Sequence, residues 1–409
     1  MKAWIWQIIA VIALAAINVY AADPALVLKQ NDLWVMAGDS ITAQRLHTNY
    51  IEAFYRTRYP NLNLQFRNSG IGGNQTGHVR SRFDYDVAAW QPTIVSIELG
   101  MNDVNAGDDP GKYIAGMKDL IAKIRAIHAT PVLISSSPVN DGSLPGNWKS
   151  DRCRRLDAYT NALKELAASE QVLMVDQYHP LLELWGRNYA KKPADPKDRA
   201  AVEKSGYISL GGDAVHTGAV GQYTMAATIL KALNADLEVS SATLAADGKV
   251  GDTKRCKISD VSSSGGVLAF TRLDEASPWP IDPGAKTAVE IMPAIRDLSH
   301  YMLTVSGLPA GRYQVLINDQ PAAVVTEKEL ADGWNMSTVF QGALAERSKS
   351  ILKLIGELEL GENNAWRAAS KTHDKDKLAA AQKQIDATEA DLRKACEPTP
   401  LRFKIQKAD

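Results

Sequence analysis

A serine stands where a nucleophile would be exposed. The apolar run 33–37 leads directly into Gly38-Asp39-Ser40, so a predicted strand ends just before Ser40. In parallel α/β sheets, functional groups collect at the carboxyl ends of the strands. A hydroxyl at that edge can attack a carbonyl carbon once a base removes its proton. Asp and Ser are also preferred at helix N-caps, so the motif by itself fits a structural cap as well as a nucleophile.

Two segments could supply the base together with a carboxylate that orients it. Asp176 precedes His179, and Asp213 precedes His216, each by three residues, a spacing that on a turn or helix places both side chains on one side. Asp176 closes a predicted strand and His179 precedes Pro180, which also fits a strand end that caps the next helix. Asp213 lies in a loop before the last predicted helix, from which it could reach the first strand. The pattern favours the later pair and leaves the earlier one open.

Donors for a developing oxyanion follow the next two predicted strands. The glycine-rich segment 68–76 could bring a bare backbone N–H close to a substrate, and Asn102 in segment 100–103 offers a neutral amide. Glycine and asparagine also simply end strands and cap helices. However, three strand ends in sequence order would deliver a nucleophile, a backbone donor and an amide donor, which together indicate acyl transfer.

The spacing of apolar residues predicts alternating strands and helices between residues 33 and 233. The predicted strands are 33–37, 63–66, 94–99, 132–135 and 172–175, and the predicted helices are 47–59, 79–90, 113–128, 151–169 and 222–233. Such alternation indicates βαβ units and a parallel sheet covered on both faces. The expected fold class is therefore α/β, a flavodoxin-like three-layer αβα domain with a five-stranded parallel sheet.

The pattern changes after residue 235. A polar stretch rich in Gly and Ser, 240–266, marks a domain border. Predicted strands follow at 267–272, 300–305 and 313–317. Residues 338–396 are mostly helical and charged. We therefore expect a smaller accessory domain over 236–409, with β-strands followed by a helical hairpin.

The first residues resemble a secretory signal. Lys2 is followed by the apolar run 3–17, broken only by Gln7, and small residues stand near position 21 where a signal peptidase would cut. The run is short for a membrane span. We expect 1–21 to be a cleaved signal peptide and 22–235 to form the α/β domain of a secreted or periplasmic protein. The alternative is an uncleaved anchor.

Composition and charge exclude several classes of protein. The chain has 409 residues, 45% of them hydrophobic and 23% charged, which is typical of a folded domain and not of a disordered chain or polytopic membrane protein. It carries 46 basic and 47 acidic residues, a net charge of −1, which becomes −2 once Lys2 is removed with the signal. A chain so close to neutral lacks the positive field that nucleic acid partners require.

The three cysteines are too far apart in sequence for a CxxC zinc or redox site. Cys256 and Cys396 both lie beside predicted strands, so the expectation is a disulfide between them with Cys153 free, the alternative being three buried thiols. The other histidines form no convincing metal-ligand set and fit surface or satisfied core positions: His47, His78, His128, His300 and His373.

Residues 33–233 resemble the SGNH/GDSL hydrolase family. The four segments that carry the resemblance, in the family's order, are Gly38-Asp39-Ser40, the glycines of 70–74, Gly100-Met101-Asn102-Asp103 and Asp213-Ala214-Val215-His216. The resemblance implies Ser40 as nucleophile and His216 as base with Asp213 as its partner, which selects the later of the two pairs.

The resemblance also implies an oxyanion hole. Its donors would be the backbone N–H groups of Ser40 and Gly73 and the side chain of Asn102. Gly73 is chosen over Gly70 because it directly precedes Asn74-Gln75-Thr76. Ile41 stands where many members carry leucine, an apolar exchange without consequence for the mechanism. No metal or cofactor is implied.

A secreted serine esterase that removes short acyl groups, in particular acetyl, from a carbohydrate is the leading hypothesis. The family implies the ester, whereas the acetylated polysaccharide is inferred from export and from a second domain whose Trp279, Trp334 and Trp366 could face a glycan or fill a core. The alternatives are a lipase or thioesterase, and a non-catalytic glycan-binding protein that retains the hydrolase fold.

Overall fold

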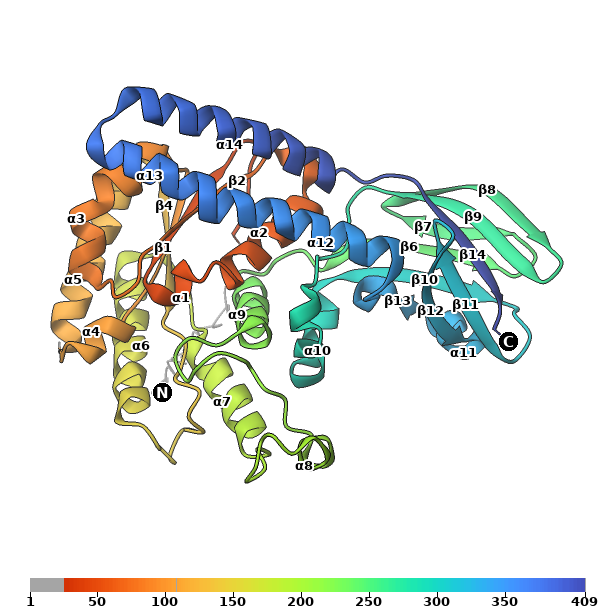
Figure 1. Cartoon of the computed structure of the whole chain (residues 1–409), viewed down its shortest axis with the longest axis horizontal. Helices are drawn as coiled ribbons and strands as arrows, with labels where there is room; N and C mark the ends of the chain where they lie inside the picture. Colours follow the sequence, from red (N-terminus) through yellow and green to blue (C-terminus); the bar gives the residue numbers. More distant parts are fainter. Residues whose placement is uncertain (1–25, 108, 409) are drawn as a thin grey trace, which may run out of the picture.

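The first half of the chain folds around a parallel sheet of five strands. The computed structural model describes residues 26–107 and 109–408, and its first sheet has the strand order β2-β1-β3-β4-β5 (Figure 1). The strands are β1 Leu33–Gly38, β2 Gln65–Gly70, β3 Ile94–Leu99, β4 Thr130–Ser135 and β5 Leu173–Val175. This order is that of the flavodoxin-like doubly wound folds, so the predicted fold class is confirmed.

Helices cover both faces of this sheet. Helices α2 and α9 pack against each other in one layer, and α3, α5 and α6 pack in the other. The helices are α1 Ser40–Ala43, α2 His47–Arg58, α3 Thr76–Asp86, α4 Met101–Asn105, α5 Pro110–Ala126, α6 Asp151–Glu170, α7 Tyr178–Tyr189, α8 Arg199–Ser205 and α9 Ala219–Ala232. Because helices lie on both faces, the central strand β3 is buried along its whole length.

Strand β2 lies further along the chain than predicted. The apolar pattern indicated 63–66, whereas the strand is Gln65–Gly70. Its polar residues are buried because distant side chains pair with them: the Arg67 guanidinium lies 2.7 Å from a carboxylate oxygen of Glu389. A charged residue with such a partner can occupy a buried strand, although in sequence it resembles the start of a loop.

The C-terminal region contains two further sheets that enclose their own core. Their strand orders are β13-β10-β6-β7 and β12-β11-β14-β9-β8. The strands are β6 Glu238–Ala245, β7 Val250–Lys254, β8 Cys256–Ser264, β9 Val267–Asp274, β10 His300–Ser306, β11 Arg312–Ile317, β12 Gln320–Thr326, β13 Trp334–Asn335 and β14 Leu401–Lys407, with short helices α10 Ala288–Ile291 and α11 Glu327–Asp332. The expected β-rich C-terminal region is therefore present.

The helices near the C-terminus return to the α/β sheet. Helix α12 (Gly342–Glu357), a π-helical turn (Leu358–Glu362), α13 (Asn363–Thr372) and α14 (Lys375–Cys396) run across β2 and α2, and the chain then re-enters the β-sheets as β14 (Figure 1). We call residues 342–396 the helical arm. The arm and the α/β domain share a small core.

Buried ion pairs and an aromatic stack join the helical arm to the α/β domain. Glu389 of α14 lies 2.9 Å from a guanidinium nitrogen of Arg56 and 2.7 Å from one of Arg67, all three being buried. Burial opposes ionisation of Glu389, yet the two guanidinium groups hold its pKa below the usual range. The Trp366 ring stacks on Trp90 with centroids 3.4 Å apart. The arm therefore completes the α/β domain.

We expect Glu389→Ala to destabilise the protein by about 3–5 kcal/mol, because it leaves the buried Arg67 guanidinium without its carboxylate and Arg56 with Glu52 alone. Asp391→Ala is the matched control, since Asp391 is exposed on the same helix, and its effect should stay within about 0.5 kcal/mol. Urea unfolding of the full chain measures both. Equal midpoints for the two variants would contradict the role assigned to Glu389.

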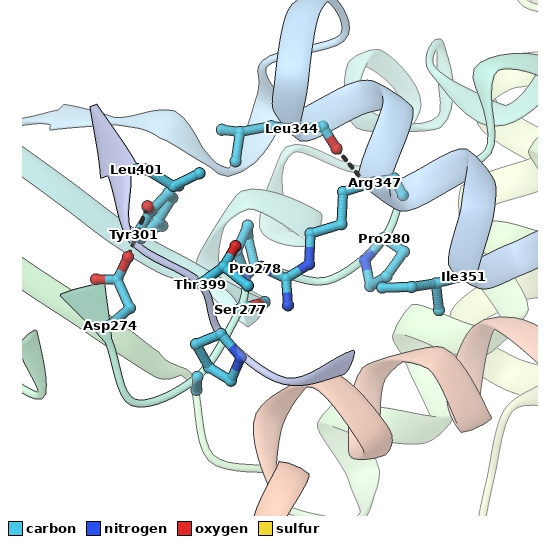
Figure 2. Close-up of a pocket in the computed structure, with 13 residues that line it drawn as sticks. Asp274, Ser277, Pro278, Pro280, Tyr301, Leu344, Arg347, Ile351, Thr399 and Leu401 are labelled. Atoms are coloured by element: carbon cyan, nitrogen blue, oxygen red, sulfur yellow. Dashed lines mark hydrogen bonds between the residues drawn. The ribbon is translucent and has the colours of Figure 1, made fainter. Parts of the chain in front are cut away.

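Arg347 of α12 forms the junction between the helical arm and the β-sheets (Figure 2). Its guanidinium donates to the carbonyl oxygens of Ala395 and Glu397, where the chain leaves α14 for β14. Beside it, the Tyr301 hydroxyl of β10 donates to an Asp274 carboxylate oxygen of β9 at 2.8 Å (Figure 2). Arg347 thereby joins the start of the helical arm to its end, and it lines the same pocket as Tyr301 and Asp274 of the sheets.

The prediction of a disulfide between Cys256 and Cys396 is wrong. All three cysteines, including Cys153, are free and buried. Cys256 belongs to the core of the two β-sheets, where its thiol lies 3.1 Å from the Ser241 carbonyl oxygen, whereas Cys396 ends α14 in the core of the helical arm. Two residues in separate cores cannot form a disulfide.

Two of the three tryptophans considered for glycan binding are core residues. Trp279 and Trp366 are buried, and Trp334 is half-buried. The predicted signal peptide, residues 1–21, lies outside the described residues. Within 26–107 and 109–408, no helix is both long enough and apolar enough to cross a membrane.

Candidate active site

Ser40 lies at the junction of β1 and α1. Asp39 is the N-cap of α1, and its carboxylate accepts a hydrogen bond from the Ile41 backbone N–H at 2.9 Å. A side chain at Gly38 would collide with Thr42 and with the Glu98 carbonyl, so only glycine lets the helix start so close to the sheet. Asp39 therefore caps the helix, and Ser40 begins it at the carboxyl edge of the sheet.

A chain of hydrogen bonds connects Ser40, His216 and Asp213. The Ser40 Oγ lies 2.8 Å from His216 Nε2, and His216 Nδ1 lies 3.1 Å from Asp213 Oδ2. The other carboxylate oxygen of Asp213 accepts the backbone N–H groups of Val215 and His216, each at 2.7 Å. These hydrogen bonds lower the pKa of Asp213, so it is a carboxylate at neutral pH.

The loop that carries Asp213 and His216 depends on two glycines. Gly211 and Gly212 have positive φ angles of 72° and 65°. A Cβ at Gly212 would lie 1.9 Å from the His216 carbonyl oxygen, which accepts the Asp213 N–H at 3.0 Å. The tight turn thus holds the carboxylate and the imidazole on one side of the loop.

Asn102 connects three strand ends. It lies in the first turn of α4, and its Nδ2 donates to the Asn74 carbonyl oxygen at 3.1 Å and to Asp39 Oδ2 at 3.3 Å. Gly73 has a φ of 75°, in the left-handed region that favours glycine. A Cβ built on Gly72 would lie 4.0 Å from the Ser40 Cβ, so this loop runs directly past the serine. The residues proposed as nucleophile and donors thus share one edge of the sheet.

The earlier pair, Asp176 and His179, belongs to a different cluster. Both ring nitrogens of His179 face carboxylates at 2.7 Å, Nδ1 that of Asp176 and Nε2 that of Asp157. Lys164 pairs with Asp176 at 2.5 Å. Hydrogen bonding to Asp176 raises the pKa of His179. This histidine is held by two carboxylates, so neither ring nitrogen is available to a serine.

A layer of buried polar side chains lies below Ser40. The sequence predicted only one part of it, a satisfied core or surface position for His47. His47 is a satisfied core histidine, 3.0 Å from Glu98, and Glu98 also accepts a hydrogen bond from Gln177 at 2.8 Å. Burial raises the pKa of Asp39 to about 7, and the nearby Glu98 carboxylate adds to the shift. The signal in the sequence was a glutamate inside the apolar run of β3.

The helical arm also reaches the residues behind Ser40. Arg45 donates to the Ala43 carbonyl at the end of α1 and to the Glu359 carbonyl of the π-helical turn, both at 2.7 Å. The Asn68 N–H donates to the Glu359 carboxylate at 2.6 Å, and the Asn68 amide donates to the Thr42 carbonyl of α1 at 2.8 Å. The helix that begins at Ser40 is thus supported from the C-terminal region, a contact that sequence reasoning missed.

A search for a metal site gives a negative result for the described part of the chain. Among residues 26–107 and 109–408, no three His, Cys, Asp or Glu side chains are grouped so that they could hold an ion.

One curated protein resembles the chain in sequence, and solved structures resemble it in fold. An acetylxylan esterase of Geobacillus stearothermophilus is 27% identical over 137 residues, which cover 31% of this chain and 60% of the esterase. The solved structure of a gut microbial diltiazem-metabolizing enzyme has a TM-score of 0.78 at 19% identity and covers 95% of this chain and 100% of its own. A crystal structure of an acetylxylan esterase from the same Geobacillus species is 22% identical and has a TM-score of 0.41, covering 51% of this chain and 96% of its own.

The diltiazem-metabolizing enzyme shares the fold of nearly the whole chain, including the C-terminal region. The model of the GDSL-like Lipase/Acylhydrolase family matches residues 36–222, which contain Ser40, Asn102, Asp213 and His216. Residues 36–222 are therefore a GDSL-like lipase/acylhydrolase domain, which supports a serine carboxylic ester hydrolase.

Proposed function

We propose that the protein is a secreted serine esterase that removes short acyl groups, in particular acetyl, from a carbohydrate through an acyl-enzyme intermediate. The observation that carries the proposal is the hydrogen-bonded chain from Ser40 through His216 to Asp213. The Geobacillus relative, named an acetylxylan esterase, supports acetyl as the acyl group and a xylan as one candidate alcohol. Export through residues 1–21 would bring the enzyme to polymeric substrates.

In the proposed mechanism, His216 Nε2 takes the Ser40 proton while Oγ attacks the ester carbonyl. The imidazolium is stabilised by Asp213, and it returns the proton to the leaving alcohol as the C–O bond breaks. Water, deprotonated by the same imidazole, then attacks the acyl-serine. Acetate leaves, and the Ser40 hydroxyl is restored.

The proposed oxyanion hole consists of the backbone N–H groups of Ser40 and Gly73 and the amide of Asn102. Both N–H groups of Asn102 have acceptors in this structure, the Asn74 carbonyl and Asp39. One of them would have to turn to the tetrahedral oxyanion, and the longer bond, to Asp39, is the one given up more easily. Removal of one such donor generally costs about 2.7–4 kcal/mol of barrier.

The proposed function is tested by comparing aryl esters of increasing chain length and by measuring acetate released from acetylated xylan and pectin. We expect aryl acetate to be cleaved fastest and at least one of the two polysaccharides to release acetate. A clear preference for a long-chain ester would instead identify a lipase or thioesterase. Absence of all ester cleavage would favour a glycan-binding protein with a hydrolase fold.

A further inference from the structure

A polar hollow of about 430 Å³ opens beside the proposed triad. Its walls are the loop after β4, the end of α7 with the segment that follows it, and the loop that carries Asp213. The side chains used below are those of Asn140, Asp141, Tyr189, Lys192, Tyr207 and Asp213. This volume lies within the range of about 300–1,000 Å³ that small-molecule sites occupy. Resting on the proposed function, we propose that the hollow binds a neutral sugar residue of the carbohydrate whose acetyl group is cleaved at Ser40.

The position of the hollow relates it to the reaction. Asp213 lines it and is also the carboxylate partner of His216. The Asn140 N–H donates to the Ala214 carbonyl oxygen at 2.6 Å, so the two walls are joined beside the triad. If the acetyl group of a sugar chain lies at Ser40, a neighbouring part of that sugar chain would reach this hollow along the carboxyl edge of the sheet.

The polar groups of the hollow suit hydroxyl groups. Among the residues that the structure describes, no hydrogen bond or ion pair occupies the side-chain polar groups of Asn140, Tyr189, Lys192 and Tyr207. Together with the Asp141 carboxylate, these side chains place hydrogen-bond donors and acceptors around the same hollow. A sugar hydroxyl both donates and accepts, and so fits such a set. The lining carries the carboxylates of Asp141 and Asp213 against the ammonium of Lys192, so it has no net positive charge to attract an anionic ligand.

One wall is fixed before a ligand arrives. The Tyr189 ring packs against Gly142, where a Cβ would lie 2.6 Å from the ring, and Gly142 has a φ of 84°. The ammonium groups of Lys149 and Lys192 lie 5.4 Å and 4.9 Å from the centre of the same ring. A wall held in this way loses little conformational freedom when a ligand binds.

The test measures kcat and KM of the full chain with acetylated xylo-oligosaccharides and with an aryl acetate. Tyr207→Ala and Lys192→Ala should each raise KM for the oligosaccharides by about threefold to tenfold, the effect of one or two lost hydrogen bonds, and leave aryl acetate hydrolysis unchanged. Lys191→Ala is the matched control, because Lys191 is exposed next to Lys192 and does not line the hollow.

The outcomes separate this inference from the proposed function. If the wild-type protein cleaves both substrates and neither variant changes KM for the oligosaccharides, the sugar site is refuted while the esterase remains. Cleavage of aryl acetate without cleavage of the acetylated xylo-oligosaccharides also refutes the sugar site. If the wild-type protein cleaves no ester, the proposed function itself fails.

Discussion

Replacing Ser40 with alanine will lower kcat/KM for aryl acetate by about a thousandfold or more and leave the protein folded. The change removes the one oxygen that lies 2.8 Å from His216 Nε2. The side chain is small and half-buried, and Asp39, not Ser40, provides the cap of α1, so the fold should not depend on the hydroxyl. Hydrolysis measured beside circular dichroism and thermal unfolding checks both parts.

Thr42→Ser provides a control for this prediction. Thr42 lies two residues along the same short helix, and the change keeps a hydroxyl group. Activity close to that of the wild type is expected, because Thr42 does not contact His216. If Ser40→Ala retained full activity, a nucleophile other than Ser40 would have to be found.

Replacing His216 with alanine will have an effect of similar size, about a thousandfold or more, whereas His179→Ala will be nearly normal in hydrolysis. His216 is the imidazole that contacts Ser40, while His179 is held between Asp157 and Asp176. Both substitutions remove the same side chain from an Asp-x-x-His segment, so each serves as the control for the other. The measurement is kcat/KM for aryl acetate at constant pH.

The opposite pattern, an inactive His179→Ala and an active His216→Ala, would move the base to the earlier segment. A loss of thermal stability in His179→Ala would not affect this comparison as long as the variant is folded at the assay temperature. Its ion-paired cluster joins α6 to α7, so some loss is expected.

The α/β sheet could be predicted because its strands are buried on both faces and therefore appear as short apolar runs between helical segments. Strand β3 matched the predicted range 94–99. Strand β2 did not, because Arg67 in that strand is paired with Glu389, more than three hundred residues later in the sequence. The partner of a buried polar residue is not visible in the local pattern, so such a strand is read as a loop.

The candidate residues of the site could be identified because they follow successive strands, whose carboxyl ends share one edge. The contact of Glu359 with Arg45 and Asn68 could not be foreseen, since the surface pattern of the helical arm gives no indication of the sheet it packs against. Glu359 of the helical arm supports α1 through its hydrogen bonds with Arg45 and Asn68. Changes far from Ser40 in sequence can therefore alter the position of the nucleophile.

The most direct test of the account is labelling with a serine-directed fluorophosphonate, followed by the mass of the intact protein, peptide mapping and residual hydrolysis of aryl acetate. The account predicts one adduct per chain, on Ser40, with activity lost in proportion to labelling, and no adduct in Ser40→Ala. Continued ester cleavage by protein that remains unlabelled at Ser40, or inactivation by an adduct elsewhere, would contradict it.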